Sequence, residues 1–239
     1  MAGQDLRYQA DGLTMVGSLH RPAKGGPAPG VLVFPEAFGL SAHAIGKAER
    51  IAGELGYVAL ACDLWGERKQ LTDMAALGPA LGALTGEPSR LRAQVRAALE
   101  TLRAQDGVDA TRIAAIGFCF GGTMAFELAT CSDISAAVGF HSGLQVPSLA
   151  AEAGRIKGKI LALLGADDPG VPPEMRTEFT RLLSEAGVDW QMTLYGGVVH
   201  SFTNPDADKA GQPGFLRYDA PADRRSWTQM AALLGEVFA

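Results

Sequence analysis

The sequence predicts an α/β protein built on a mostly parallel, doubly wound sheet that is flanked by helices. Three observations support this prediction. The apolar runs lack polar alternation, which is typical of strands that are buried on both faces. The stretches between these runs have apolar residues three or four positions apart, as amphipathic helices do. A chain of 239 residues, 47% of them hydrophobic, suits one large domain of this class, so we expect a single domain over residues 1–239.

Strands and helices are predicted to alternate along most of the chain. Strands are expected at six apolar runs bounded by turn residues, namely 31–34, 58–62, 113–116, 136–140, 160–164 and 191–195. Helices are expected at about 42–55, 87–105, 121–130, 173–187 and 221–238. Because crossovers between parallel strands are right-handed, this alternation places helices on both faces of one sheet.

Two segments depart from the alternation. Residues 5–8 and 13–19 are predicted to form an antiparallel hairpin joined at Asp11 and Gly12, which is a strong turn pair. The segment 66–90 is rich in glycine and proline, and we expect it to form a cap or rim over the functional site rather than a second domain. The sequence shows no internal repeat and no linker between domains.

Charge and composition exclude several classes of protein. The net charge is -5 and no basic run is present, which argues against a nucleic-acid partner. The first residues carry charges and glycine where a secretory signal needs an apolar stretch, and no segment approaches the ~20 apolar residues of a membrane span. We therefore expect a cytoplasmic protein without a membrane partner, and a monomer, since no exposed apolar stripe is visible. The three cysteines, Cys62, Cys119 and Cys131, have no metal-binding spacing and suit a reducing compartment.

A glycine-rich turn around Cys119 carries the strongest chemical signal. The residues GFCFGG at 117–122 lie between a predicted strand and a predicted helix, as in a nucleophile elbow with cysteine in place of serine. Small residues are needed at Gly117 and Gly121 because a side chain there collides with neighbouring backbone. The helix N-terminus also favours a thiolate. The alternative is a βα turn that holds an inert, buried cysteine.

A base and an acid are expected from two later loops. His200 follows the last predicted strand, and Asp168 follows the strand before it. Ligand chemistry in open α/β sheets gathers at the carboxyl ends of the strands, so Cys119, Asp168 and His200 can converge there. Their order, nucleophile then acid then histidine, is the order found in α/β-hydrolase triads.

Rival residues exist for both roles. The other histidines lack a comparable position, since His20 falls in the hairpin, His43 in a helix and His141 just after a strand. Asp167 is the rival acid; Asp168 is preferred because it lies deeper in the turn. Either carboxylate could instead be a solvated turn residue or a helix cap.

The loop after the first core strand is expected to complete an oxyanion pocket. In this architecture, one backbone donor follows the nucleophile and a second comes from this loop, which indicates the N–H groups of Phe120 and Ala37. Glu36 is unexpected there, because a carboxylate beside such a pocket opposes developing negative charge. Local reasoning alone favours a solvated loop carboxylate.

Five motifs in order resemble the dienelactone hydrolase (carboxymethylenebutenolidase) family of α/β-hydrolases, over almost the whole chain. They are PEAFGL at 35–40, DLWG at 63–66, GFCFGG at 117–122, GADDP at 165–169 and HSF at 200–202. The resemblance implies that Cys119 is the nucleophile, His200 the base and Asp168 its orienting acid. It implies that Glu36 holds the resting thiol and helps to form the thiolate. It also implies opening of a lactone through an acyl-cysteine intermediate, with no metal or organic cofactor.

One position departs from the family pattern. Members that act on dienelactone carry an arginine four residues after the catalytic histidine, where it binds the substrate carboxylate, whereas this chain has Asn204. Loss of such a charged fork disfavours an anionic substrate. Arg68, Arg90 and Arg217 are candidate replacements, Arg68 first, although each is expected to be a solvated surface charge.

The sequence therefore predicts a cysteine hydrolase of an ester or lactone. A broad carboxylesterase or thioesterase is the alternative within enzymes, and it differs only in the shape of its pocket. A catalytically silent α/β-hydrolase that binds a ligand is the alternative from another class.

Overall fold

The computed structural model describes residues 3–239 and contains one eight-stranded sheet. The strand order is β1-β2-β4-β3-β5-β6-β7-β8, in which β1 and β2 are antiparallel to their neighbours and the other strands are parallel. The strands are β1 (Gln4–Ala10), β2 (Leu13–His20), β3 (Ala28–Phe34), β4 (Val58–Ala61), β5 (Val108–Phe118), β6 (Ala136–Phe140), β7 (Lys159–Gly165) and β8 (Trp190–Tyr195). The prediction of a mostly parallel sheet is confirmed.

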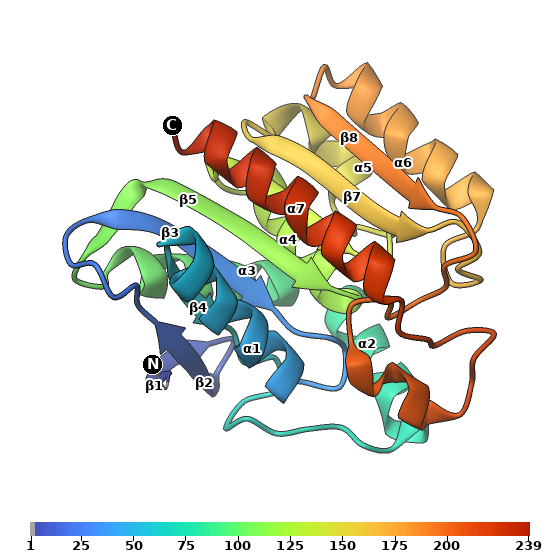
Figure 1. Ribbon diagram of the computed structural model, residues 1–239, viewed down its shortest axis with the longest axis horizontal. Helices are drawn as coiled ribbons and strands as arrows, with labels where there is room; N and C mark the ends of the chain where they lie inside the picture. Colours follow the sequence, from blue (N-terminus) through green and yellow to red (C-terminus); the bar gives the residue numbers. More distant parts are fainter. Residues whose placement is uncertain (1–2) are drawn as a thin grey trace.

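Helices cover both faces of this sheet, as Figure 1 shows. On one face, α1 and α7 bury residues against the strands; on the other face, α3, α4 and α6 do so. The helices are α1 (Ala42–Arg50), α2 (Met74–Thr85), α3 (Pro88–Arg103), α4 (Phe120–Thr130), α5 (Leu149–Glu152), α6 (Pro173–Glu185) and α7 (Ala220–Val237). This is the doubly wound arrangement that the alternation of strands and helices predicted.

Burial on both faces explains the continuous apolar runs. In β3, Val31 and Val33 belong to the core under α1 and α7, whereas Leu32 belongs to the core under α3 and α4. Successive side chains of a strand point to opposite faces, so both sets of positions must be apolar.

One predicted boundary was wrong, and two other segments differ from the prediction in detail. The strand expected at 113–116 begins earlier, at Val108, because its first residues pair with the start of β3 across a bulge. These residues are mostly polar, so the apolar pattern did not reveal them. The expected helix at 42–55 has both of its predicted ends, but it is α-helical only to Arg50, and a π-helical turn, Ile51–Leu55, completes it before Gly56, whose φ is 75°. The segment 66–90, expected to be a cap or rim, contains α2, for which no helix was predicted.

Helix α2 escaped prediction because it contains Pro79 and two glycines. Its start is nevertheless marked by Asp73, whose carboxylate accepts a hydrogen bond from the backbone N–H of Ala75 at 2.9 Å. Such an N-cap satisfies a donor that the helix itself leaves unpaired. Leu77 and Leu84 then anchor α2 by burial.

The carboxyl ends of the parallel strands form one edge of the sheet, and the candidate functional residues all follow strands there. Glu36 follows β3, Cys119 follows β5, Asp168 follows β7 and His200 follows β8. Across residues 3–239, none of the helices combines the length and apolar character needed to cross a bilayer.

Candidate active site

Cys119 occupies a sharp turn between β5 and α4. Its φ of 55° and ψ of -120° are rare for a residue with a side chain and are a form of backbone strain that clusters at functional sites. A Cβ on Gly117 would collide with the carbonyl of Gly121, and a Cβ on Gly121 would collide with the carbonyls of Phe34 and Pro35. These contacts supply the steric reason for glycine on both sides of the cysteine.

We expect Gly121→Ala to destabilise the fold by at least ~2 kcal/mol, because the new methyl group meets backbone that cannot move aside. Urea denaturation measures this change. The matched control is Gly235→Ala in α7, where a Cβ meets no atom within 4 Å. The control should stabilise the protein by about 0.5–1 kcal/mol, since alanine favours helix. Equal stability of the two variants would refute the steric argument.

His200 and Asp168 come together as a buried pair. His200 Nδ1 lies 2.7 Å from Asp168 Oδ2, and the other carboxylate oxygen of Asp168 accepts from the N–H of Gly170 at 2.8 Å. Asp168 is only 2% exposed, whereas Asp167 is exposed. The structure thus favours Asp168 over Asp167 as the acid that orients the ring.

The Cys119 thiol completes this arrangement, because it forms a side-chain hydrogen bond with His200. Burial opposes a charge on the ring, but attraction to the Cys119 sulfur and the hydrogen bond to Asp168 outweigh it and raise the pKa of His200 to about 10. A ring that holds its proton at neutral pH suits an ion pair with a thiolate. Burial raises the pKa of both other thiols, Cys62 and Cys131.

A second histidine, which sequence reasoning set aside, packs against the base. The ring centroids of His141 and His200 are 5.1 Å apart. His141 Nε2 lies 2.8 Å from the hydroxyl of Thr203, and the His141 backbone has a φ of 38°. Burial, with neighbouring His200 and His43, lowers the pKa of His141 well below its usual value, so its ring is neutral. Its position directly after β6, at the edge where the site lies, was the available signal.

The two candidate oxyanion donors lie on adjoining segments. The backbone of Phe34 and Pro35 lies directly against Gly121, which places the loop after β3 beside the nucleophile turn. Phe120 is the first residue of α4, where backbone N–H groups lack partners inside the helix. Ala37 is buried, and its carbonyl accepts from Trp65 Nε1 at 2.9 Å, which holds the loop in place.

Glu36 is buried, not solvated as local reasoning favoured. Its Oε1 lies 2.6 Å from His43 Nδ1 and 3.1 Å from Asn204 Nδ2, and Ser41 donates to Oε2 at 3.4 Å. Burial alone raises the pKa of a carboxyl group, but the bonds from His43 outweigh it, and the pKa of Glu36 is lowered. Within residues 3–239, no hydrogen bond joins Glu36 to Cys119 in this resting arrangement.

Asn204 lies at the site, beside Glu36. One end of its amide donates to Glu36, and the other end accepts from the N–H of Asp206 at 3.0 Å, as the N-cap of the 3₁₀ helix Pro205–Ala210. Both ends of the amide are thus engaged in the structure.

Arg68 is not brought to the site, and its assignment to substrate binding is corrected. Its guanidinium donates to the carbonyls of Val16 and Gly17, at 3.0 and 2.9 Å, and to Asp5 at 2.6 Å. These bonds fasten the N-terminal hairpin. Its backbone, with a φ of 54°, aims the side chain there, and no sequence pattern foretold that direction. Arg90 and Arg217 are likewise engaged elsewhere, Arg90 with Asp11 and Arg217 with the carbonyl of Gly197.

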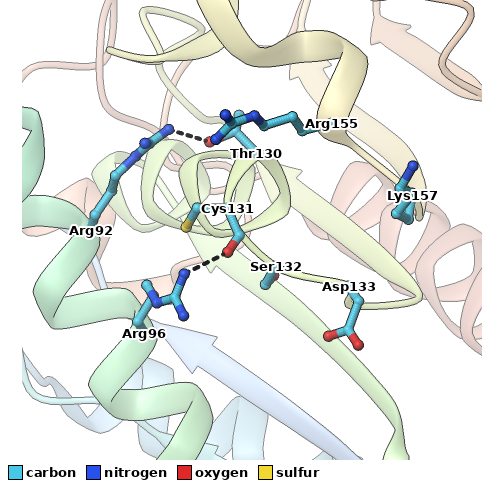
Figure 2. Close-up of a pocket in the computed structure, with 8 residues that line it drawn as sticks. All are labelled: Arg92, Arg96, Thr130, Cys131, Ser132, Asp133, Arg155 and Lys157. Carbon is cyan, nitrogen blue, oxygen red and sulfur yellow. Dashed lines mark hydrogen bonds between the residues drawn. The ribbon is translucent and has the colours of Figure 1, made fainter.

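A separate cavity of about 330 Å³ lies at the far end of α4, as Figure 2 shows. It is lined by Arg92, Arg96, Thr130, Cys131, Ser132, Asp133, Arg155 and Lys157. Helix α4 has 11 residues, so this cavity lies roughly 16 Å along the helix from Cys119. Arg92 and Arg96 donate to the Thr130 hydroxyl and the Cys131 carbonyl, which are favourable cation contacts at a helix C-terminus.

No group of three or more histidine, cysteine or acidic side chains in residues 3–239 is arranged to hold a metal ion. The groups that the site does bring together are side chains and backbone donors. They form a nucleophile turn, a histidine–carboxylate pair and a second buried carboxylate.

The chain is similar over nearly its whole length to proteins of one hydrolase family. Residues 15–238 match the model of the dienelactone hydrolase family. The chain is 48% identical to the solved structure titled m3DLH. The match covers 99% of this chain and 98% of that one, with a TM-score of 0.94. A dienelactone hydrolase-like promiscuous phosphotriesterase from metagenomic libraries is 43% identical over the full length of both chains, also with a TM-score of 0.94. A Bradyrhizobium protein named "Probable 2-oxo-3-(5-oxofuran-2-ylidene)propanoate lactonase" is 26% identical, with 80% of each chain covered.

Proposed function

The chain belongs to the dienelactone hydrolase family, which has the α/β-hydrolase fold, and from this membership we propose that it hydrolyses carboxylic esters or lactones with Cys119 as nucleophile. One observation carries the proposal. The thiol of a cysteine held at a strained strand-to-helix turn is hydrogen-bonded to a histidine whose ring is paired with a buried aspartate. This is the arrangement that nucleophile, base and orienting acid require.

The proposed reaction has two halves. The Cys119 thiolate attacks the carbonyl carbon, and the resulting oxyanion is held by the N–H groups of Ala37 and Phe120. The intermediate collapses to an acyl-cysteine as the alcohol or enol leaves, and the proton on His200 accompanies the leaving group. A water then gives a proton to His200 and attacks the thioester, which releases the acid and restores the thiolate–imidazolium pair.

Glu36 does not hold the resting thiol in this structure, where the thiol bonds His200, so we propose for it only the other part of the role that the family resemblance implies, helping to form the thiolate when substrate arrives. Its present bonds are to His43, Asn204 and Ser41. Contact with the thiol therefore requires the carboxylate to turn away from them when substrate arrives.

A neutral, apolar substrate suits the residues around this site. The position four residues after His200 holds an amide instead of a cation, and none of the three candidate arginines is free to replace it. Phe215, which is 37% exposed, lies with its ring centroid 5.4 Å from that of His200. We propose the segment 66–90 as the rim of the pocket, because Gln70 and Leu71 donate to the carbonyls of Leu40 and Phe38.

The proposal is tested with a panel of p-nitrophenyl esters, simple lactones, dienelactone and a neutral phosphotriester. The phosphotriester is included because a structure 43% identical to this chain is titled a promiscuous phosphotriesterase. We expect turnover of neutral esters or lactones, and an acyl adduct on Cys119 in intact-protein mass spectrometry under rapid quench. A carboxylesterase or thioesterase would differ only in its preferred substrates. A binding protein would give neither turnover nor adduct.

We expect Asn204→Arg to shift selectivity toward substrates that carry a carboxylate. A charge-assisted hydrogen bond is worth about 1–3 kcal/mol, and Glu36 will compete for the new guanidinium, so we expect a shift of about 1 kcal/mol, or roughly fivefold in kcat/KM. The measurement compares two substrates that differ only in a carboxylate and its methyl ester. Asn204→Gln, which stays neutral, should leave the ratio unchanged. Efficient turnover of dienelactone by the wild type would contradict the proposed neutral preference.

A further inference from the structure

A strap of residues 211–217 lies across His200, the base of the proposed triad. The His200 N–H donates to the carbonyl of Phe215 at 3.0 Å, and the Arg217 N–H donates to the carbonyl of His200 at 3.2 Å. Leu216 forms a parallel β-bridge with His200 between these two bonds. The strap therefore has a fixed position relative to the base.

The strap also holds its own shape. The N–H groups of Phe215 and Leu216 both donate to the carbonyl of Gln212, at 2.8 and 2.7 Å, which closes a turn. The guanidinium of Arg217 donates to the carbonyl of Gly197, at 2.6 Å, in the loop that leads to the base. These bonds fix the backbone from which the side chain of Phe215 extends.

The ring of Phe215 lies against the base and against the turn that carries the acid. Its centroid is 5.4 Å from that of the His200 ring, with 32° between the two planes. A Cβ built on Gly170 would lie 3.5 Å from the Phe215 ring, and the N–H of Gly170 donates to the Asp168 carboxylate at 2.8 Å. Phe215 is nevertheless 37% exposed. One part of the ring covers the histidine–carboxylate pair, and another part is open to a ligand.

Exposed large apolar side chains gather at this site. Three are exposed among residues 3–239, namely Phe38, Leu194 and Phe215. Phe38 belongs to the loop that carries a proposed oxyanion donor, and Phe215 packs on His200. Apolar surface around a few polar groups is typical of a small-molecule site. Two of the three exposed side chains thus adjoin the proposed site.

The proposed chemistry decides which part of a substrate comes closest to Phe215. His200 Nδ1 is taken by Asp168, so the proton for the leaving group comes from Nε2. The leaving oxygen must then lie within about 3 Å of this nitrogen. The carbonyl oxygen points instead toward the backbone donors of Ala37 and Phe120. The alcohol portion of an ester is therefore the portion beside His200, within reach of the ring that packs on it.

We infer that Phe215 is a specificity-determining residue that binds the alcohol portion of the substrate and favours alcohols with an aromatic or other apolar group. This inference rests on the proposed function. In a lactone, the same contact falls on the ring carbon that bears the leaving oxygen. A Phe215 that only packs against His200 and shields it from water would instead affect all substrates alike, since the base acts on each of them.

Three esters test this role: ethyl acetate, 2-phenylethyl acetate and ethyl 3-phenylpropanoate. The first two give the same acetyl-cysteine and have alcohols of similar acidity, so a difference between their kcat/KM values arises before or as the alcohol leaves. The third carries its phenyl ring on the acyl side. We expect the wild type to prefer 2-phenylethyl acetate to ethyl acetate, and Phe215→Ala to lower this preference roughly tenfold, because an apolar ring-to-ring contact is lost. The ratio of ethyl 3-phenylpropanoate to ethyl acetate should stay unchanged.

Two further variants serve as controls. Phe215→Tyr keeps an aromatic ring and should keep the preference. Leu194→Ala removes another exposed apolar side chain, from the edge strand β8, and should change neither ratio. A thermal melt checks that Phe215→Ala is folded, which we expect because the strap is bonded to His200 through its backbone.

The outcomes separate the inference from the proposed function. Equal slowing of all three esters in Phe215→Ala, or a wild type without the preference for 2-phenylethyl acetate, contradicts the inference and leaves the proposed hydrolysis standing. Absence of ester turnover in the wild type, or equal turnover by Cys119→Ala, overturns the proposed function and the inference with it.

Discussion

Replacement of Cys119 by alanine is expected to abolish ester turnover and to leave the protein folded. Alanine is no larger than cysteine and keeps the same backbone conformation, so the turn between β5 and α4 should persist. With no nucleophile, kcat should fall roughly 10⁴-fold or more, and only the background from binding and oxyanion stabilisation should remain. The measurements are steady-state kinetics with a p-nitrophenyl ester and a thermal melt.

The other two cysteines provide matched controls. Cys62 is fully buried, and Cys131 lies at the opposite end of α4 from Cys119. Burial raises the pKa of both thiols, which disfavours the reactive thiolate. Cys62→Ala and Cys131→Ala should retain most activity, and a thiol reagent should label Cys119 selectively. Equal turnover by the wild type and Cys119→Ala would remove Cys119 from the mechanism.

The local sequence was enough to predict those features that depend mainly on the nearby backbone. The nucleophile turn was recognisable because Gly117 is required by a collision with Gly121 inside the turn itself, although the collision that requires Gly121 is with the carbonyls of Phe34 and Pro35 on another loop. The core strands were recognisable because burial on both faces leaves a continuous apolar run. Asp168 was preferable to Asp167 because the turn after β7 buries one neighbour and exposes the other.

The local sequence was not enough to predict the role of a side chain whose partners lie on distant segments. His43 was read as an ordinary helical residue, because its two partners, Glu36 and Thr203, come from separate loops that only tertiary packing brings to α1. Arg68 was wrongly considered for the pocket, because the direction of its side chain depends on a turn with positive φ. Glu36 was explicable only by the family resemblance, since no local pattern shows that a loop carboxylate will be buried beside a histidine and an asparagine from distant segments.

Loss of the base or its orienting acid is expected to have the second largest effect. His200→Gln removes the group that exchanges protons with Cys119 and the leaving group, and Asp168→Asn leaves the ring without its carboxylate partner at 2.7 Å. Each change should lower kcat roughly 10²–10⁴-fold. Asp167→Asn is the matched control, because this neighbouring carboxylate is exposed and makes no contact with the ring. It should have a mild effect.

The pH dependence of Asp168→Asn separates orientation from simple damage to the fold. Burial opposes a charge on the His200 ring, but attraction to Cys119 and the hydrogen bond that the ring donates to Asp168 outweigh it and raise the pKa of His200 to about 10. Removal of the carboxylate takes away one of the interactions that raise the pKa of His200, so this pKa should fall. The ring should then lose its proton, and with it the ion pair to the thiolate, at a lower pH than in the wild type. The alkaline limb of kcat/KM should therefore move to lower pH in Asp168→Asn and stay in place in Asp167→Asn. If Asp167→Asn proved the more damaging change, or moved the limb instead, the assignment of the acid would be reversed.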